Sequence, residues 1–200
     1  MYKELTSLFS KTAIEVCEGQ QYDVDFETRD DVTIPEYLKM IEYKTSVLVA
    51  AAMKIGAIVA NAPKKEAEAI YEFGRNLGIA FQLQDDYLDA FGDPKTFGKQ
   101  IGGDIIENKK TFLYLKALEV ANNDDKKKLV YFYNQKLKEN TIKITGVKRI
   151  FKINNIPVFI KEEIENYTEK AFETLLRMNI SEENKQDLKE FGLWLMNRTV

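Results

Sequence analysis

The residues with the clearest chemistry in this chain lie in one acidic stretch, from Phe81 to Asp89. It reads Phe-Gln-Leu-Gln-Asp-Asp-Tyr-Leu-Asp. An α-helix turns about 100° per residue, so four of these side chains would share one face, within an arc of about 100°. They are Gln82, Asp85, Asp86 and Asp89. Clustered carboxylates repel one another, and oxygen ligands of this kind suit Mg²⁺, which shares its remaining coordination with waters and substrate phosphates.

A solvated acidic face is the alternative interpretation of this stretch, and its surroundings weigh against it. The preceding segment 67–80 is rich in alanine, glycine and aromatic residues, as a buried helix would be. The chain has no histidine and one cysteine, which excludes histidine-based acid–base catalysis and histidine-ligated zinc. Carboxylates, lysines and a hard metal remain. The glycine-rich segment that follows, 91–111, carries four lysines: Lys95, Lys99, Lys109 and Lys110.

The composition predicts one soluble domain spanning residues 1–200. Hydrophobic residues make up 44% and charged residues 30% of the chain. A net charge of −3 gives no electrostatic footprint for nucleic acid. The single Cys17 cannot form an internal disulfide and no signal peptide opens the chain, so we expect a cytoplasmic location. The most apolar run, 47–62, is too short to cross a membrane, so no stable membrane insertion is expected.

The hydrophobic pattern has a helical period throughout and predicts an all-α fold. Thr33 is expected to cap a helix that has Pro35 in its first turn. We expect helices at about 2–25, 33–60, 64–91, 105–121, 124–139, 141–153, 157–178 and 182–198.

Four segments of the chain, in order, resemble one enzyme family. Residues 19–23 read Gly-Gln-Gln-Tyr-Asp, and residues 37–45 end in Tyr-Lys-Thr. The acidic stretch 81–89 is followed by Gly-Lys-Gln-Ile-Gly-Gly-Asp-Ile and then Asn-Lys-Lys-Thr within residues 98–111. These resemble the Gly-Gln-x-x-Asp helix, the Lys-Thr helix and the second aspartate-rich region of the trans-isoprenyl diphosphate synthases. This polyprenyl synthetase family includes farnesyl and geranylgeranyl diphosphate synthases.

The resemblance implies the isoprenoid synthase fold, an antiparallel helical bundle around a central cavity, and a homodimer. The family also carries a first aspartate-rich motif, upstream of its Gly-Gln-x-x-Asp helix. Only eighteen residues precede Gly19 here, and none forms that motif. We therefore expect the C-terminal part of a synthase, with N-terminal helices missing. A truncated chain, a fragment and a degenerate member all remain open.

The resemblance also assigns roles to residues of the acidic stretch and of the lysine-bearing segments. Asp85 is expected to bind Mg²⁺ directly, with Asp86 and Asp89 acting through water or in support. The substrate diphosphate is expected to pair with three lysines: Lys44, Lys99 and Lys109. For Lys99 and Lys109 a solvated loop lysine is the alternative, and for Lys110, which has no clear counterpart, that alternative is favoured.

Thr45 and Gln82 are expected to face the carbocation, which makes Lys44, Thr45 and Gln82 the expected catalytic residues. For Gln82 the alternative is a helix residue that is hydrogen-bonded within the bundle. Gln20 and Asp23 are expected in the substrate pocket, although Asp23 could also be ordinary helix surface.

The activity implied is transfer of an allylic prenyl diphosphate onto isopentenyl diphosphate through Mg²⁺-assisted ionisation, in short-chain isoprenoid biosynthesis. Because the first motif is absent, the 200-residue chain alone is expected to be inactive. The alternative function is a non-catalytic regulatory or binding subunit that partners a complete synthase. The length of the product cannot be predicted from these residues.

Overall fold

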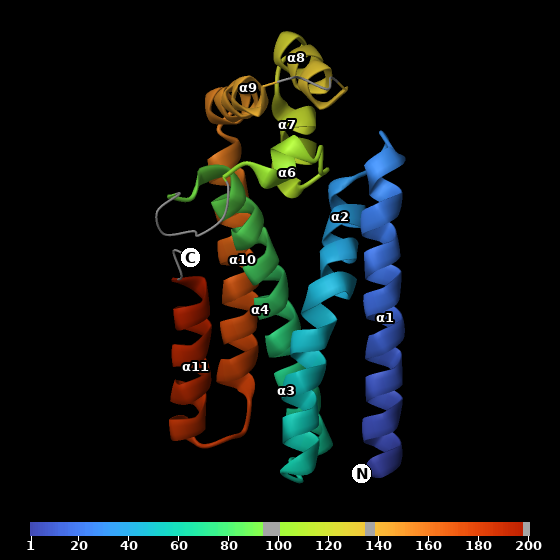
Figure 1. Cartoon of the computed structure of the whole chain (residues 1–200). Coiled ribbons are helices and arrows are strands. Elements are labelled where there is room, and N and C mark those ends of the chain that lie inside the picture. The colour runs from blue at the N-terminus through green and yellow to red at the C-terminus, as the bar shows by residue number, and fades with distance from the viewer. Residues whose placement is uncertain (94–100, 135–138, 198–200) are drawn as a thin grey trace. The chain divides into compact units, whose positions relative to one another are not determined.

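All regular elements in the described part of the chain are helical (Figure 1). The computed structural model describes residues 1–93, 101–134 and 139–197. The predicted all-α fold is confirmed, whereas the central cavity stays a prediction. Two compact units can be distinguished. The first contains Met1–Val24, Leu38–Gln82 and the segment from Glu163, and the second contains Asp25–Tyr37 and Leu83–Glu162. That residues 1–200 form one domain also stays a prediction.

The helices follow the predicted ranges closely in most of the chain. They are α1 (Tyr2–Thr28), α2 (Ile34–Ile41), the π-helical turn η1 (Glu42–Ser46), α3 (Val47–Val59), α4 (Lys64–Phe91), α6 (Gly103–Ile106), α7 (Phe112–Val120), α8 (Asn123–Asn134), α9 (Asn140–Ile153), α10 (Ile156–Arg177) and α11 (Glu182–Met196). The helix expected at 33–60 is helical from Ile34 to Val59 and contains the π-helical turn η1. One prediction was wrong, because the helix expected at 105–121 is two helices, α6 and α7.

The break between α6 and α7 has a local cause at Asn108. Its φ of 59° lies in the left-handed region, which asparagine tolerates better than most residues. The backbone N–H of Lys109 then donates to the Asp104 carbonyl at 2.9 Å, which closes the short helix. Thr111 is extended, with φ −73° and ψ 172°, and α7 begins at the next residue. A hydrophobic period cannot reveal such a break, because both helices keep apolar faces.

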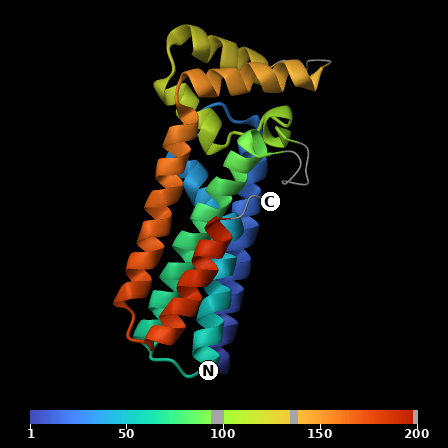
Figure 2. The ribbon, with the colours of Figure 1, turned by 90° about the vertical axis from the view of Figure 1, so that its left-hand side faces the viewer.

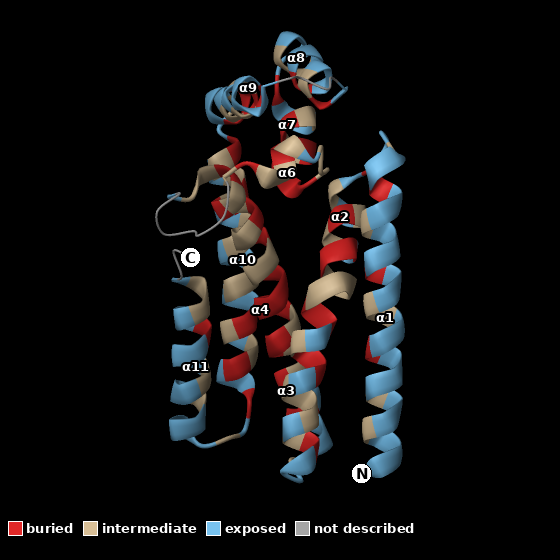
Figure 3. Cartoon of the chain, viewed as in Figure 1, coloured by how far each residue is buried: buried red, intermediate tan, exposed pale blue. Residues whose placement is uncertain are grey.

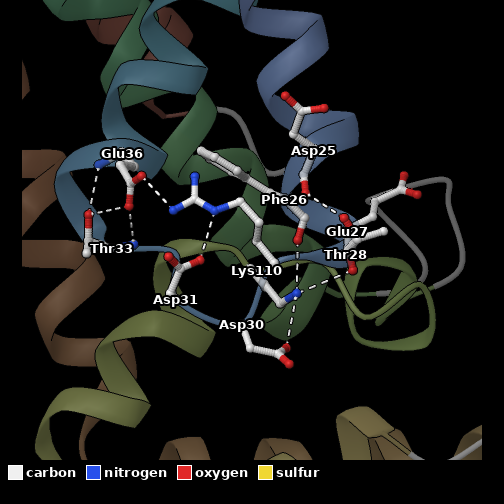
Figure 4. Close-up of polar contacts among 10 residues, drawn as sticks. Asp25, Phe26, Glu27, Thr28, Asp30, Asp31, Thr33, Glu36 and Lys110 are labelled. Carbon is white, nitrogen blue, oxygen red and sulfur yellow. Dashed lines mark hydrogen bonds and ion pairs between the residues drawn. The ribbon is translucent and has the colours of Figure 1, made fainter.

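The start of α2 was predicted correctly from Thr33. The Thr33 backbone N–H donates to Glu36 Oε2 at 2.9 Å, and the Glu36 N–H donates to Thr33 Oγ1 at 3.4 Å (Figure 4). This reciprocal pair is a capping box, which satisfies two backbone donors at the helix start. Arg29 donates to the other carboxylate oxygen of Glu36 at 2.9 Å and fixes the preceding link.

The first unit is held together by the packing of α4 against α10 and α3. Buried residues of α4, of α10 and of the position directly after α10 form one apolar cluster: Ile70, Phe73, Leu77, Ala171, Leu175 and Met178. In both ribbon views α4, α10 and α11 run side by side (Figures 1 and 2). The α3 and α4 backbones approach closely, because a Cβ on Gly74 would lie 3.0 Å from the Ala50 Cα.

The core of the second unit is formed by α7, α8 and α9, which contact one another. Most of α7 is buried, and α9 buries Val147, Ile150 and Phe151. The rings of Tyr114 and Tyr133 stack with their centroids 4.0 Å apart. This core supports α6 and the residues around it, which lie beside the acidic end of α4 in the same unit.

Apolar side chains also lie on the surface of the described residues. Figure 3 shows that α1 is exposed along most of its length, and Phe9 in it is 67% exposed. Within the described ranges, no helix combines the length and the apolar character that a membrane-spanning helix needs.

Candidate functional site

The π-helical turn η1 presents two of the predicted site residues, Lys44 and Thr45. A π-helical turn inside an α-helix is rare and frequently marks a functional site. Here it lies against two glycines of neighbouring helices. A Cβ on Gly19 of α1 would clash with the backbone nitrogen of Lys44, and a Cβ on Gly78 of α4 would lie 2.8 Å from the Ser46 Cα. The turn is therefore held at backbone contact distance from both helices.

Ser46, at the end of η1, adds a polar contact to this packing. It is fully buried, and its hydroxyl donates to the carbonyl of Arg75 in α4. Arg75 lies in α4, one helical turn before Gly78. The hydrogen bond and the glycine contact together fix the orientation of η1 against α4.

Lys44 is paired with Asp23 across α1 and η1. The Lys44 Nζ lies 2.6 Å from Asp23 Oδ2, and the two side chains are 34% and 22% exposed. An anion that approaches this lysine would meet an ammonium already held in one direction by a carboxylate. Gln20, one turn earlier in α1, is exposed and takes no part in the pair.

Thr45 and Gln82 were both expected to face the carbocation, and the structure brings the two side chains into contact. Thr45 Oγ1 donates to Gln82 Oε1 at 3.2 Å. Both side chains are half-buried. A hydroxyl and an amide oxygen at this place could stabilise positive charge, since neither group is a strong nucleophile. The alternative, a glutamine hydrogen-bonded within the bundle, fits the same contact.

Asp86 is buried and pairs with a residue that the sequence did not single out. The hydroxyl of Tyr37, in α2, donates to Asp86 Oδ2, and the two residues are 1% and 5% exposed. A buried carboxylate is costly unless it is hydrogen-bonded, so the tyrosine stabilises its charged form. This contact fits the supporting role expected of Asp86.

Asp89 is held by the backbone that follows α4. Its carboxylate oxygens accept the N–H groups of Gly103 and Asp104, each at 3.1 Å. Burial, the charge of Asp104 and the charge of Asp85 nonetheless raise the pKa of Asp89 to about 6. Burial also raises the pKa of Asp104, although Lys109 opposes that shift. Negative charge is therefore in excess around Asp89.

This excess of negative charge fits a divalent cation, because the donors are carboxylate oxygens alone. Within the described residues, no three acidic or cysteine side chains are grouped so that they could hold a metal ion by themselves. A metal ion at this place would need further oxygen ligands from outside these side chains. A Mg²⁺ ion that is shared with phosphate oxygens is coordinated in this way.

Three of the four lysines in the segment that follows were given expectations, and they have different positions. Lys99 lies outside the described residues. Lys109 is 39% exposed, and its Nζ lies 3.5 Å from Asp104 Oδ1 and 3.3 Å from Glu107 Oε2. It is thus an accessible cation next to the Asp89 carboxylate cluster.

Lys110 is not the solvated loop lysine that was expected. Its side chain is 8% exposed. Its Nζ donates to the carbonyls of Phe26 and Glu27, at 2.9 and 3.3 Å, and lies 3.6 Å from Asp30 Oδ1 (Figure 4). These carbonyls end α1, which has no basic residue in its own last turn, so Lys110 supplies the C-terminal cation.

The predicted site residues fall into two groups, one in each unit. Lys44, Thr45 and Gln82 belong with Asp23 to the first unit, and the aspartates of α4 belong with Lys109 to the second. The first group can bind an anion and stabilise positive charge, and the second can bind a cation and an anion together. Sequence reasoning assigned no role to Tyr37 or Asp104, although Asp104 stands directly after the Gly102-Gly103 pair of the matched segment.

Comparison with known proteins gives the family of the chain. The pattern of the Polyprenyl synthetase family matches residues 1–150. A short chain isoprenyl diphosphate synthase of Methanothermobacter thermautotrophicus is 44% identical over 130 residues, which are 65% of this chain and 40% of that protein. A geranylgeranyl diphosphate synthase of Methanosarcina mazei is 51% identical over 112 residues, 56% of this chain and 35% of that protein.

The fold agrees with this match over nearly the whole chain. A crystal structure of geranylgeranyl pyrophosphate synthase has a TM-score of 0.92 and 52% identity, and the match covers 98% of this chain and 61% of that one. The chain spans less than half the length of the two curated relatives described above. The chain belongs to the polyprenyl synthetase family.

Proposed function

We propose that this chain provides one half of a prenyl-transfer site, the half that contains the second aspartate-rich region and binds diphosphate and a metal ion. The reaction joins an allylic prenyl diphosphate to isopentenyl diphosphate. The observation that carries the proposal is the excess of negative charge shared by Asp85, Asp89 and Asp104 beside the cation of Lys109. A carboxylate cluster next to a lysine suits a diphosphate that arrives with a divalent ion.

In this proposal the lysines and carboxylates bind the leaving group. Lys44 and Lys109 pair with diphosphate oxygens as mobile point charges, and Lys99 is proposed to join them. Asp85 is the direct ligand for Mg²⁺, with Asp86 and Asp89 in support. The ion, when bound, supplies Lewis-acid stabilisation of the charge that develops on the diphosphate.

The remaining residues act on the organic part of the substrate. The allylic C–O bond breaks, and its electron pair leaves with the diphosphate. Thr45 and Gln82 direct oxygen atoms toward the carbocation and stabilise it without adding to it. The double bond of isopentenyl diphosphate forms the new C–C bond, and the proton that is then lost goes to the released diphosphate. Asp23 keeps the Lys44 ammonium in place and, with Gln20, borders the substrate pocket.

The proposed partners are the two diphosphate substrates, Mg²⁺ and a second copy of the chain. The proposed location is the cytoplasm. The 200-residue chain has no aspartate-rich motif before Gly19, so we expect binding without turnover. The alternative, a non-catalytic subunit, would use the same contacts and contribute them to a complete synthase.

Binding of an allylic ligand tests the proposal. Calorimetry should detect binding of geranyl diphosphate to the chain when Mg²⁺ is present. This binding should become much weaker when Mg²⁺ is removed. Geraniol at the same concentration should not bind. Geraniol is the matched control, because it has the same chain without the diphosphate. Equal binding of both ligands, or binding that ignores Mg²⁺, would overturn the proposal.

Turnover by the chain addresses the alternative function. When the chain alone is incubated with radiolabelled isopentenyl diphosphate and an allylic diphosphate, no elongated prenyl diphosphate should form. Steady product formation would show that these residues suffice for catalysis and would exclude the non-catalytic subunit.

A further inference from the structure

Lys143 of α9 is a buried lysine whose ammonium contacts only neutral groups within the described residues. It is 3% exposed and lies on the buried side of α9 with Val147 and Ile150. Lysine is almost never fully buried unless it is paired with a carboxylate. Burial also lowers the pKa of Lys143. A buried charge of this kind needs a structural reason.

The contacts of Lys143 lie at the end of α6. Its Nζ donates to the Ile106 carbonyl at 3.2 Å and to Asn108 Oδ1, and it lies 5.5 Å from the centre of the Tyr133 ring. Ile106 is the last residue of α6, where carbonyl groups lack helical partners and a cation is favourable. Lys143 thus caps α6 and holds the side chain of Asn108, the residue with left-handed backbone.

The same turn is fastened at its other end by Asp89. We call residues 102–109 the acidic turn. The Gly102 N–H donates to the Asp89 carbonyl at 2.7 Å, and the next two N–H groups donate to the Asp89 carboxylate at 3.1 Å each. Ile144, the residue after Lys143, packs on Gly102. A Cβ on Gly102 would lie 3.0 Å from the Ile144 side chain. The acidic turn is therefore held between α4 and α9.

The acidic turn carries Lys109, an accessible cation of the candidate site. The Lys109 N–H donates to the Asp104 carbonyl at 2.9 Å, and its Nζ lies 3.5 Å from Asp104 Oδ1. The direction of the Lys109 side chain therefore depends on the conformation at Asn108, which Lys143 holds.

We propose that Lys143 is a positioning residue, which binds no ligand itself but holds the acidic turn so that Lys109 and Asp104 stay beside Asp89. Its effect on the order of the turn is independent of the proposed function. Its effect on ligand affinity rests on that function. Two experiments separate these parts.

The first experiment measures amide hydrogen exchange by NMR in the ligand-free 200-residue chain. In Lys143→Met, the N–H groups of Gly103, Asp104 and Lys109 should exchange at least tenfold faster, while the buried amides of α10 stay unchanged. Lys127→Met, in the exposed part of α8, is the control and should change neither set. Unchanged exchange in the turn would overturn the proposal, and so would a uniform increase that includes α10.

A second variant covers the case in which Lys143→Met does not fold. Asn108→Gly removes one acceptor of the Lys143 ammonium, suits the left-handed backbone at this position and leaves the lysine in place. It should raise exchange at Asp104 and Lys109 in the same way. If it folds with unchanged exchange in the turn, the proposal is wrong.

The second experiment measures binding of pyrophosphate with Mg²⁺ in a double-mutant cycle. Lys143→Met should weaken binding about tenfold in the original chain and have almost no further effect in a Lys109→Met background, since a residue that acts through another couples to it. The same tenfold loss in both backgrounds would show that Lys143 does not act through Lys109. If the original chain does not bind pyrophosphate, the proposed function fails, and hydrogen exchange alone decides the role of Lys143.

Discussion

The carboxylates at the end of α4 differ in the groups that hold them. Asp86 is buried against the Tyr37 hydroxyl, and Asp89 accepts two backbone N–H groups. Asp85 is half-buried and contributes to the raised pKa of Asp89. Two of the three aspartates therefore support the local structure, and the role of Asp85 as the direct metal ligand stays a prediction from the family resemblance.

Tyr37→Phe tests the structural part of this distinction. The variant keeps the ring but removes the donor to a buried carboxylate, so the free energy of unfolding should fall by about 1.5–3 kcal/mol. Urea denaturation followed by circular dichroism measures it. Tyr131→Phe, at a tyrosine that is 56% exposed, is the control and should change stability by less than about 0.5 kcal/mol. Equal stability of Tyr37→Phe and the original chain would contradict the structural role of the Tyr37–Asp86 contact.

The sequence predicted some site contacts at this scale and not others. The family resemblance gave Thr45 and Gln82 the same expected role, facing the carbocation, and the two side chains are hydrogen-bonded to each other. Tyr37 was missed because its partner lies 49 positions away, and a single tyrosine carries no sign of its partner. Lys143 was missed for the same reason, since it looks like one more surface lysine in a basic helix.

At the scale of elements, the site depends on how closely η1 packs against its neighbours. Two glycines make this possible, Gly19 in α1 and Gly78 in α4. The sequence showed Gly19 only as part of the matched segment 19–23, and gave no reason to single out Gly78.

Gly78→Ala tests this packing. The new Cβ would lie 2.8 Å from the Ser46 Cα, so η1 must shift, and the free energy of unfolding should fall by about 1–3 kcal/mol. Gly56→Ala in α3 is the matched control, because no atom lies within 4 Å of its Cβ. The free energy of unfolding of Gly56→Ala should rise by about 0.5–1 kcal/mol, because alanine has a higher helix propensity than glycine. Thermal unfolding measures the stability of both variants. A Gly78→Ala chain as stable as Gly56→Ala would contradict the close packing.

Helix boundaries were predictable where a capping residue or a breaker marks them. The α4 range was predicted at 64–91 and is observed there, and Thr33 forms the expected cap. The π-helical turn was not predictable, because it depends on backbone contacts with two other helices. The break at Asn108 was not predictable either, since asparagine is also common within helices and at their ends.

On the scale of the whole molecule, exposed apolar side chains are the main feature. Leu48 and Val59, eleven positions apart, lie on one face of α3 and are 58% and 57% exposed. On α1, Tyr2 and Phe9 are 84% and 67% exposed. Exposed apolar surfaces of this kind promote association.

We therefore expect the chain to self-associate, which sedimentation equilibrium can measure. Leu48→Gln combined with Val59→Gln should raise the dissociation constant about tenfold or more, since each side chain contributes apolar area. Val158→Gln, in α10 and 51% exposed, is the control and should leave association unchanged. A stable monomer at all concentrations would contradict the expectation.

The central claim is that the chain binds diphosphate through a metal ion held at Asp85. Calorimetry with pyrophosphate, with and without Mg²⁺, tests it most directly on the original chain, Asp85→Ala and the control Asp124→Ala in α8. Asp124 is exposed and lies outside both groups of site residues. We predict binding that requires Mg²⁺, is retained in Asp124→Ala and is lost in Asp85→Ala. Binding that ignores Mg²⁺, or that persists unchanged in Asp85→Ala, would contradict the metal site.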